Sequence, residues 1–446
     1  MNTTSTVDLI KDLVSTARVI VVKKLSNNDR RWADGQQFGH QNGPYIPANI
    51  RRDAGFPDLI PRTDKPHILE RELQTVWIRT GETKTSRLVH YSNKGPECHL
   101  TGVPKDEFAG IGPASFILFA KQDASGPLVF SCLVVDSAET EACDYLEMLF
   151  EIGPDFEAGQ FVGVVAKEEP GLEDLASQII KAIADGTISK FVSGFTFPTT
   201  QQLAIEAQTT YLATSGLNSL DPFKLETPGD VLMHISRELE LRLYKRYHTR
   251  FYAARLAELL TAGEVKPTID HAIRKLVDGF EQIYKEVMLS SVQRMKSRSG
   301  YSFEHHVQRM LTDGKVPFAA QKFTGNQRPD FILPSKKLLD KAARERDEVL
   351  ILSLKTVLRE RWKQVLKESK TCDVFLATVD DKVAAESIAD MNDDGIYLVV
   401  PESLKNSRYA EYKGRSNVIT FKEFFESEIA ILRKPIWIKN GITCEF

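Results

Sequence analysis

Residues 328–370 read RPDFILPSKKLLDKAARERDEVLILSLKTVLRERWKQVLKESK. Asp330 opens one apolar segment, Lys355 closes the next, and Glu368 follows in a stretch of helical character. Apolar segments that alternate with helices, here and in CDVFLATV from Cys372 and GIYLVVP from Gly395, are typical of a buried mixed sheet. If the first two segments pair as neighbouring strands, the side chains of Asp330 and Lys355 lie close together.

An acid, a lysine and a second acid in this arrangement are the parts of a metal-dependent phosphodiesterase. Hydrolysis of a phosphodiester needs a cation to neutralise charge on the phosphoryl oxygens and a positioned water for in-line attack. Asp330 would hold Mg²⁺ through oxygen, its preferred ligand type, and Lys355 would orient the water or stabilise the developing charge. Taken singly, Asp330 could instead be a strand-entry carboxylate and Lys355 a solvated strand end.

Two flanking clusters add to this interpretation. Just after Lys355 stand Arg359, Glu360 and Arg361. Arginine binds guanine O6 and N7 bidentately and a carboxylate accepts from cytosine N4, so Arg-Glu-Arg at the start of a helix is a compact reader of G·C pairs in the major groove. The alternative is a solvated charge cluster.

Upstream, KSRSGYSFE (296–304) predicts a basic loop, with Lys296 and Arg298, that leads into a helix starting at Ser302. Glu304 would then lie in the first turn of that helix. It is either a partner of the helix dipole or an additional carboxylate of the metal site.

The rest of the chain divides into a strand-rich and a helix-rich part. Short apolar segments separated by Gly, Pro, Asn and Asp predict β-strands from Arg18 to about Val135. The composition shifts to Ala, Ser, Thr and Gln before residue 228, and long segments with apolar residues at three- and four-residue spacing follow. We expect two domains, at 1–190 and 226–446, joined by a linker at 191–225.

Length, charge and cysteine content set bounds on the class of protein. The chain has 446 residues, a formal net charge of −3 and 27% charged residues, so a nucleic-acid surface would be a local groove rather than the whole molecule. Its five cysteines show no CxxC or zinc-ligand spacing. The amino terminus lacks the pattern of a signal peptide, and no apolar run has bilayer-spanning length. A cytoplasmic protein that has no membrane segment is expected.

In order and nearly in spacing, KSRSGYSFEHHVQRML, GNQRPDFILP, LSLKTVLRERWKQVLKE and GIYLVVPESL resemble the catalytic domain of the EcoRII family of type II restriction endonucleases. These enzymes belong to the wider PD-(D/E)xK nuclease fold, an α/β fold with a central mixed sheet flanked by helices. In that family the second acid has moved from the position two before the lysine to the following helix. Here Ser353 stands two before Lys355, and Glu368 supplies the displaced acid.

The resemblance implies an active site of Asp330, Lys355 and Glu368, with Glu304 as an accessory acid and Mg²⁺ as cofactor. It further implies that Arg359, Glu360 and Arg361 read a CC-(centre)-GG core, and the Arg-Glu-Arg form resembles the branch that recognises CCNGG. A homodimer that cuts both strands of double-stranded DNA, and a cognate DNA methyltransferase that makes no direct contact with it, are also implied.

The amino-terminal part, VVKKLSNND from Val21 and GHQNGPYIPANI from Gly39, resembles the effector-binding domain that EcoRII carries ahead of its nuclease, an all-β DNA-binding pseudobarrel. Two loops would grip the duplex, the first with His40 and Tyr45, the second with Lys94, Glu97 and His99. The second loop has fewer cations than the family pattern, which weakens phosphate binding. The domain could therefore read a different or longer sequence.

Some expectations stay open at this point. Arg237 and Tyr244 are candidates for a platform that stacks flipped central nucleotides; the alternative is plain helix surface. One rival function is a modification-dependent endonuclease, in which the Cys98/His99 loop reads a modified site. Another is a DNA-binding regulator with an inactive nuclease fold, against which the joint presence of Asp330, Lys355 and Glu368 argues.

Overall fold

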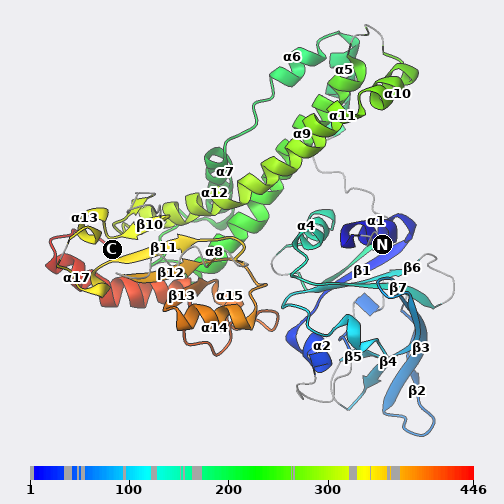
Figure 1. The fold of residues 1–446 in the computed structure, drawn as a ribbon, viewed down its shortest axis with the longest axis horizontal. Coiled ribbons are helices and arrows are strands. Elements are labelled where there is room, and N and C mark those ends of the chain that lie inside the picture. The colour runs from blue at the N-terminus through cyan, green and yellow to red at the C-terminus, as the bar shows by residue number, and fades with distance from the viewer. Residues whose placement is uncertain are drawn as a thin grey trace. The chain divides into compact units, whose positions relative to one another are not determined.

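The computed structural model forms two compact units, described here one at a time (Figure 1). The first contains Met1–Val165, Asp380–Asn392 and Ser403–Ser416, and the second contains Ala166–Val379, Asp393–Glu402 and Asn417–Phe446. The residues that the structure describes are 5–34, 43–47, 50–51, 56–93, 97–121, 128–150, 152–153, 156–162, 173–262, 264, 267–320, 329–341, 343–358, 362 and 372–446, with the backbone alone for 291–301.

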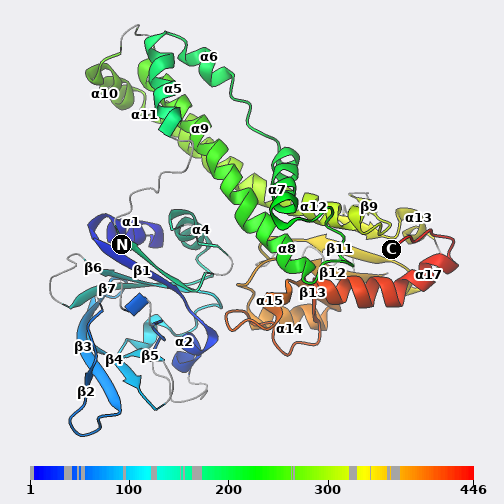
Figure 2. The same ribbon diagram turned by 180° about the vertical axis from the view of Figure 1, so that it is seen from behind.

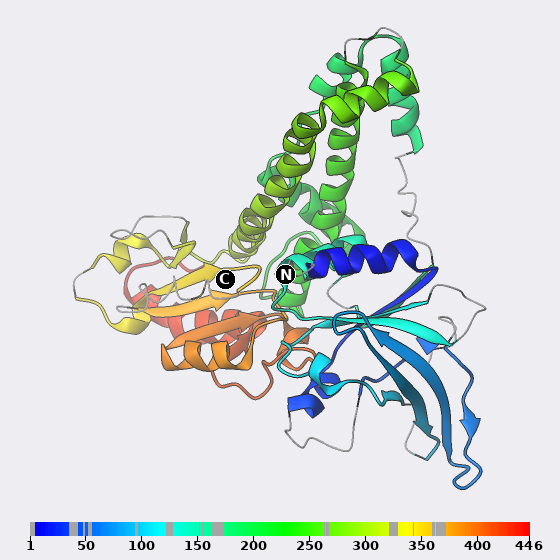
Figure 3. The same cartoon turned by 45° about the vertical axis from the view of Figure 1, so that its right-hand side comes forward.

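A curved sheet forms the first unit, and its bend is visible in Figure 3. Its hydrogen-bonded order is β5-β4-β3-β7-β6-β1-β8, with β2 beside β3. The strands are β1 (Val19–Lys24), β2 (Ile60–Pro61), β3 (Ile68–Trp77), β4 (Glu82–Tyr91), β5 (Cys98–Thr101), β6 (Phe116–Lys121), β7 (Val129–Val135) and β8 (Ala158–Val162). The strands predicted from Arg18 to Val135 are confirmed.

Both faces of this sheet are covered. On one face Ile20 and Val22 of β1 pack with residues of helices α1 (Thr6–Thr16) and α4 (Thr140–Leu149). On the other face Val21 joins a core that includes Trp77. Successive strand residues point to opposite faces, which explains why β1 is buried at every position. The predicted all-β domain is therefore wrong in part, since two helices complete its core.

Short helices occupy the connections of the first unit. They are α2 (Asn27–Arg31), η1 (Trp32–Asp34) and η2 (Lys105–Glu107). Ser26 caps α2, and its side chain and that of Asp29 form a reciprocal capping box. Helix α14 (Ala385–Asp393) and the residues after α15 (Glu402–Lys405) also belong largely to this unit.

A six-stranded mixed sheet forms the centre of the second unit, in the order β14-β13-β12-β11-β10-β9. Its strands are β9 (Ala319–Ala320), β10 (Phe331–Leu333), β11 (Leu350–Leu354), β12 (Asp373–Ala377), β13 (Ile396–Val400) and β14 (Val418–Thr420). The strands from β11 to β14 are parallel, whereas β10 runs antiparallel to β11 and to β9. The predicted buried mixed sheet is confirmed, and β9 and β14 extend it.

Long helices project from this sheet, and several shorter ones gather at their far end (Figure 2). The helices are α5 (Glu173–Ala184), α6 (Ile188–Ser193), α7 (Thr200–Ser215), α8 (Pro228–His234), η3 (Ile235–Leu239), α9 (Glu240–Thr261), α10 (Ile269–Asp278), α11 (Phe280–Ile283), η4 (Tyr284–Leu289) and α12 (Ser290–Asp313). The remaining ones lie nearer the sheet: α13 (Lys336–Leu339), η5 (Arg346–Glu348), α16 (Phe421–Glu423), η7 (Phe424–Arg433) and α17 (Lys434–Lys439). No helix among the described residues is long and apolar enough to cross a bilayer.

The predicted linker at 191–225 is largely structured. Helix α7 lies inside it, begins with a capping box between Thr199 and Gln202, and buries Leu203 and Ala207. Its many Thr, Gln and Ala residues give little contrast between faces, which hid the helix from a search for apolar periodicity. The amino-terminal segment of the first unit ends near residue 165, before the boundary of 190 expected from composition.

Candidate active site

The strand pair β10 and β11 brings Asp330 and Lys355 together. The pairing is antiparallel, with Phe331 opposite Leu352, so Asp330, just before β10, falls opposite Ser353, two residues before Lys355. The Lys355 Nζ stands 3.9 Å from the Asp330 Oδ2. The adjacency of these two strands, expected from the sequence, is confirmed.

Asp330 occupies a partly desolvated position. Its side chain is 16% exposed, that of Lys355 is 28% exposed, and the Leu354 N–H donates a 2.7 Å hydrogen bond to the Asp330 Oδ2. Burial raises the pKa of Asp330 above its ordinary value, and the Lys355 ammonium and the Leu354 N–H, which both lower it, offset only part of that rise. An added cation at this carboxylate would be favourable, because the local charge balance leaves the ionised form under-stabilised.

We expect Asp330→Asn to stabilise the metal-free fold at about pH 8 and to lose this advantage as the pH falls. A folded-state pKa above the ordinary value of 3.8 means that the folded carboxyl binds more protons than the unfolded one, so stability falls as the pH rises from about 3.8 through the folded-state pKa. The asparagine Oδ1 can still accept from Leu354 N–H. Thermal unfolding from about pH 3.5 to about pH 8 with a chelator present measures the difference across this range, and a destabilised variant at high pH would contradict it.

Ser353 fills the position that a common nuclease motif gives to an acid. It lies on β11 two residues before Lys355, so the two share a face of the strand, and it is 3% exposed. The displaced acid Glu368 and the proposed base readers Arg359, Glu360 and Arg361 lie outside the described residues, as does most of the helix expected at 359–369. On either side of the three readers, Leu358 and Trp362 are buried.

Glu304 lies in α12, but not where the sequence placed it. The backbone is helical from Ser290 to Asp313, so the basic loop expected at 296–301 and the helix start at Ser302 are wrong. Lys296 and Arg298 have helical backbone, and their side chains lie outside the described residues. Ser302, flanked by buried Phe303, is 1% exposed and sits in the middle of the helix.

A buried polar cluster replaces the expected capping role of Ser302. The Ser302 hydroxyl donates to the Glu240 carboxylate, and the His306 Nε2 lies 2.9 Å from the Glu240 Oε2. Gln208 completes it, with its Nε2 3.0 Å from the His306 Nδ1. Glu240 and His306 are fully buried. These contacts join α7, α9 and α12, and thereby fix the helix that carries Glu304; sequence reasoning missed them because the partners lie up to about a hundred residues apart.

The residues around Asp330 suit Mg²⁺. Within the ranges that the structure describes, no group of three His, Cys, Asp or Glu side chains forms a metal cage. Mg²⁺ is usually held by one or two carboxylates together with water and substrate phosphates, not by such a cage. The under-stabilised carboxylate of Asp330 next to Lys355 fits that mode, and Glu368 and Glu304 are the candidates for a second oxygen ligand.

In the first unit the two segments expected to grip DNA meet, although His99 lies in strand β5 and not in a loop. Tyr45 and His99 form an antiparallel bridge, and their ring centroids are 6.0 Å apart. The approach is close: a Cβ at Gly43, where φ is +138°, would lie 1.9 Å from the Leu100 carbonyl oxygen, so only glycine fits. Glu97 contacts His99, with an Oε2–Nε2 distance of 3.4 Å. His40 and Lys94 lie outside the described residues.

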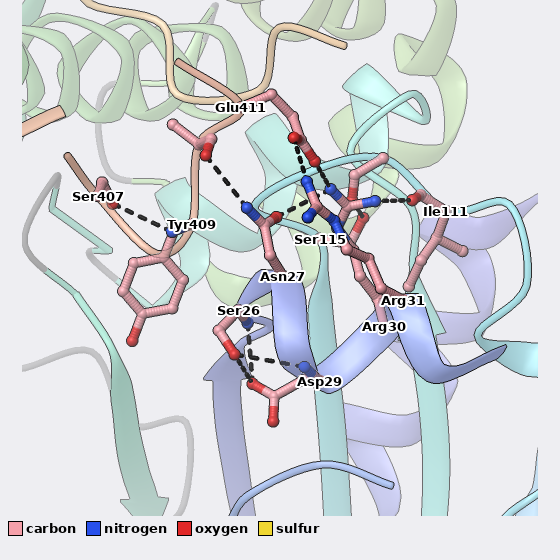
Figure 4. Close-up of polar contacts among 12 residues, drawn as sticks. Ser26, Asn27, Asp29, Arg30, Arg31, Ile111, Ser115, Ser407, Tyr409 and Glu411 are labelled. Carbon is pink, nitrogen blue, oxygen red and sulfur yellow. Dashed lines mark hydrogen bonds and ion pairs between the residues drawn. The ribbon is translucent and has the colours of Figure 1, made fainter. Parts of the chain in front are cut away.

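Asp29 holds the first of these loops to helix α2. Its Oδ1 accepts from the Tyr45 N–H at 2.7 Å, while its Oδ2 accepts from the Lys23 Nζ and from Ser26. Figure 4 shows the capping contact between Ser26 and Asp29. The Lys23 ammonium and these donors hold the pKa of Asp29 below its ordinary value although burial acts in the opposite direction. The loop that carries Tyr45 is therefore anchored by a buried ionised carboxylate.

An arginine pair next to Asp29 was missed by the sequence analysis. Arg30 and Arg31 both contact the carboxylate of Glu411, and Arg30 also donates to the Asn27 Oδ1 at 2.8 Å and the Ile111 carbonyl at 3.1 Å (Figure 4). The side chains of Arg30 and Glu411 are less than a tenth exposed. Only the folded chain shows this pairing, because Glu411 lies 381 residues further along.

We expect Glu411→Ala to destabilise the first unit by about 3 kcal/mol, because it removes the carboxylate partner of a buried arginine. Glu157→Ala is the matched control: Glu157 pairs with Arg408, both side chains are more than half exposed, and the cost should stay below about 0.5 kcal/mol. Chemical denaturation of both variants measures the loss of unfolding free energy. Equal losses would show that burial of the ion pair does not determine its contribution to stability.

The two candidates for nucleotide flipping stay predictions, and one of them loses support. Tyr244 is 2% exposed and packs its ring against Phe197 and His248. A buried ring of this kind cannot stack an extruded base without rearrangement. Arg237, in the π-helical segment η3, donates to the Val379 carbonyl at 3.2 Å, just beyond strand β12.

Known proteins resemble the carboxyl-terminal part of this chain. Residues 258–425 match the family model described as EcoRII C terminal. The chain is 32% identical to the type II restriction enzyme EcoRII of Escherichia coli over 146 residues, which are 32% of this chain and 36% of that enzyme. It is 25% identical to the type II restriction enzyme SsoII of Shigella sonnei over 204 residues, 43% of this chain and 65% of that enzyme.

Among solved structures, metal-depleted Ecl18kI in complex with uncleaved DNA matches with a TM-score of 0.45 and 22% identity, over 59% of this chain and 85% of that one. The sequence matches span less than two thirds of the length of either curated relative. The chain is a homologue of type II restriction enzymes. Its residues 258–425, which include Asp330 and Lys355, match the model of the EcoRII C-terminal family.

Proposed function

We propose that this chain is a Mg²⁺-dependent type II restriction endonuclease that cleaves double-stranded DNA at a site with a CC-(centre)-GG core, CCNGG or an extended version of it. The observation that carries the proposal is the Asp330–Lys355 pair, with Nζ 3.9 Å from Oδ2 at neighbouring strand ends, inside the segment that matches the EcoRII C-terminal family.

The side chains divide the work of phosphodiester hydrolysis. Asp330 and Glu368, with Glu304 as an accessory acid, would hold Mg²⁺, which supplies charge neutralisation at the scissile phosphate and a more acidic bound water. Lys355 orients the attacking water and stabilises charge that develops on the phosphoryl oxygens. In-line attack then leaves a 5′-phosphate and a 3′-hydroxyl.

Recognition is assigned to Arg359, Glu360 and Arg361, which begin four residues after Lys355. The guanidinium groups of the two arginines and the carboxylate of Glu360 match the major-groove edges of G·C pairs. A nearly palindromic target is matched by a two-fold symmetric protein, so the active species is a homodimer in which each copy cuts one strand. A cognate methyltransferase would protect the host sites.

The first unit binds a further DNA segment through the loops of Tyr45 and His99 and regulates cleavage. His40, Lys94 and Glu97 belong to the same proposed surface. Support comes from the contact between these loops in the structure. The scarcity of cations on the second loop predicts weaker phosphate binding and a shallower dependence of DNA affinity on salt concentration.

Digestion of phage DNA with Mg²⁺, followed by sequencing of the fragment ends, tests the proposal. Cuts at one CC-(centre)-GG sequence, absent when a chelator replaces Mg²⁺, are the expected result. Parallel digestion of methylated and unmethylated DNA identifies a modification-dependent enzyme. Intact DNA in every condition, despite tight binding in a mobility-shift assay, would contradict the nuclease and favour a DNA-binding regulator.

A further inference from the structure

An apolar stripe lies exposed along the helical segments at the far end of the second unit. Its six members, all between 52% and 82% exposed, are Ile269, Ile273, Val277, Phe280, Tyr284 and Met288. They occupy α10, α11 and η4, which follow one another in the sequence, and Figures 1 and 2 show α10 and α11 near the far end of α9. Large apolar side chains gathered in this way mark an interaction surface.

The stripe residues are not needed for the packing of their own chain. Helix α10 has no buried residue at all. On the next segments, Ile283 and Val287 face the other way and pack with Tyr252 of α9. One apolar face of this segment therefore packs in the core of its own chain, and the second face, the stripe, is exposed to solvent.

The spacing of these six residues reads the same in both directions. Its successive spacings are four, four, three, four and four residues. A two-fold axis near Gly279 would place Ile269 opposite Met288 of a second copy, Ile273 opposite Tyr284, and Val277 opposite Phe280. Isologous contacts need this kind of self-complementary pattern, since the same patch must match itself after rotation.

The charges beside the stripe favour the same antiparallel pairing. Asp270 pairs with Arg274, and Glu281 with Lys285, within each chain, and all four side chains are more than 70% exposed. The symmetry centre of these charges lies one residue before that of the stripe, so an antiparallel pairing near Gly279 brings Arg274 of one copy close to Glu281 of the other, and Asp270 close to Lys285. A parallel pairing would instead set like charges against each other, and flanking charges of this kind determine the orientation of paired helices.

We propose that residues 269–289 are the contact through which two copies of this chain associate, antiparallel about an axis near Gly279. The inference rests on the homodimer of the proposed function and locates its contact. It is tested without DNA or Mg²⁺, so its failure would be distinct from a failure to cleave.

The first experiment is sedimentation equilibrium of the full chain and of Ile273→Glu and Phe280→Glu. The wild type should be dimeric, and each variant should dissociate about 100-fold more readily, because a charge enters the apolar contact twice per dimer. Ile431→Glu is the control, since Ile431 is 68% exposed on η7 in the same unit and lies outside the stripe. A monomeric wild type, or a dimer that the stripe variants leave unchanged, would overturn the proposal.

Charge reversal tests the antiparallel register with variants that leave the apolar residues intact. Arg274→Glu and Glu281→Arg should each weaken self-association by about 10-fold, because each sets like charges face to face. Mixed in equal amounts, the two variants should form heterodimers as stable as the wild-type dimer, since both cross-contacts are then attractive. Failure of mixing to restore association would exclude this register, and circular dichroism confirms that each variant is folded.

Discussion

Replacing Lys355 with alanine will lower the rate of DNA cleavage by about 10³-fold and leave DNA binding within about 3-fold of the wild type. Loss of one charge-stabilising donor at a developing anion costs about this much in other enzymes. The ammonium lies 3.9 Å from Asp330 at the strand ends of the second unit, so the substitution removes the group proposed to act at the scissile phosphate. Single-turnover cleavage of a duplex that contains the site, next to a mobility shift without Mg²⁺, measures both quantities.

Lys355→Arg separates charge from geometry in this experiment. The guanidinium keeps the positive charge but is planar and cannot reproduce the compact ammonium, so we expect activity to remain at least about 10²-fold below the wild type. Lys315→Ala serves as the control, because Lys315 pairs with Glu445 on an exposed surface. Full activity in Lys355→Ala would contradict the assignment of the active site, whatever the behaviour of DNA binding.

The central sheet was predictable because its strands carry their own signal. Strands β11, β12 and β13 are short apolar runs bounded by polar residues, and parallel strands covered on both faces have this composition. The pairing of β10 with β11 followed from the same runs and brought Asp330 to Lys355. Strands β9 and β14, of two and three residues, lack enough length to show a pattern.

The helix boundaries were harder to predict, because the sequence shows local preferences whereas contacts between residues distant in the sequence decide where the helices run. Ser302 and Gly300 favour a helix start, yet α12 runs through both. The buried contacts of Ser302 and His306 with Glu240 stabilise a continuous helix, and tertiary packing of this kind routinely overrides local propensity. Likewise nothing near Arg30 in the sequence points to Glu411, the residue that pairs with it.

The position of the second acid leads to the other large effect. Glu368→Ala should reduce cleavage by about 10²–10³-fold, since it removes a proposed oxygen ligand of Mg²⁺. Adding Ser353→Glu to that variant should restore at least about 10-fold of the loss, because residues two apart on β11 share the face that presents Lys355. Cleavage is measured at several Mg²⁺ concentrations. The rescued double variant should cleave at a lower Mg²⁺ concentration than Glu368→Ala alone.

Ser353→Glu alone is the informative control for this pair. Ser353 is 3% exposed on β11, so an added carboxylate is costly unless a cation stands beside it. Without Mg²⁺ the single variant should therefore be less stable than the wild type, and added Mg²⁺ should recover part of the difference. Full cleavage by Glu368→Ala would contradict the displaced acid, whereas loss without rescue by Ser353→Glu would show that the serine position no longer reaches the metal.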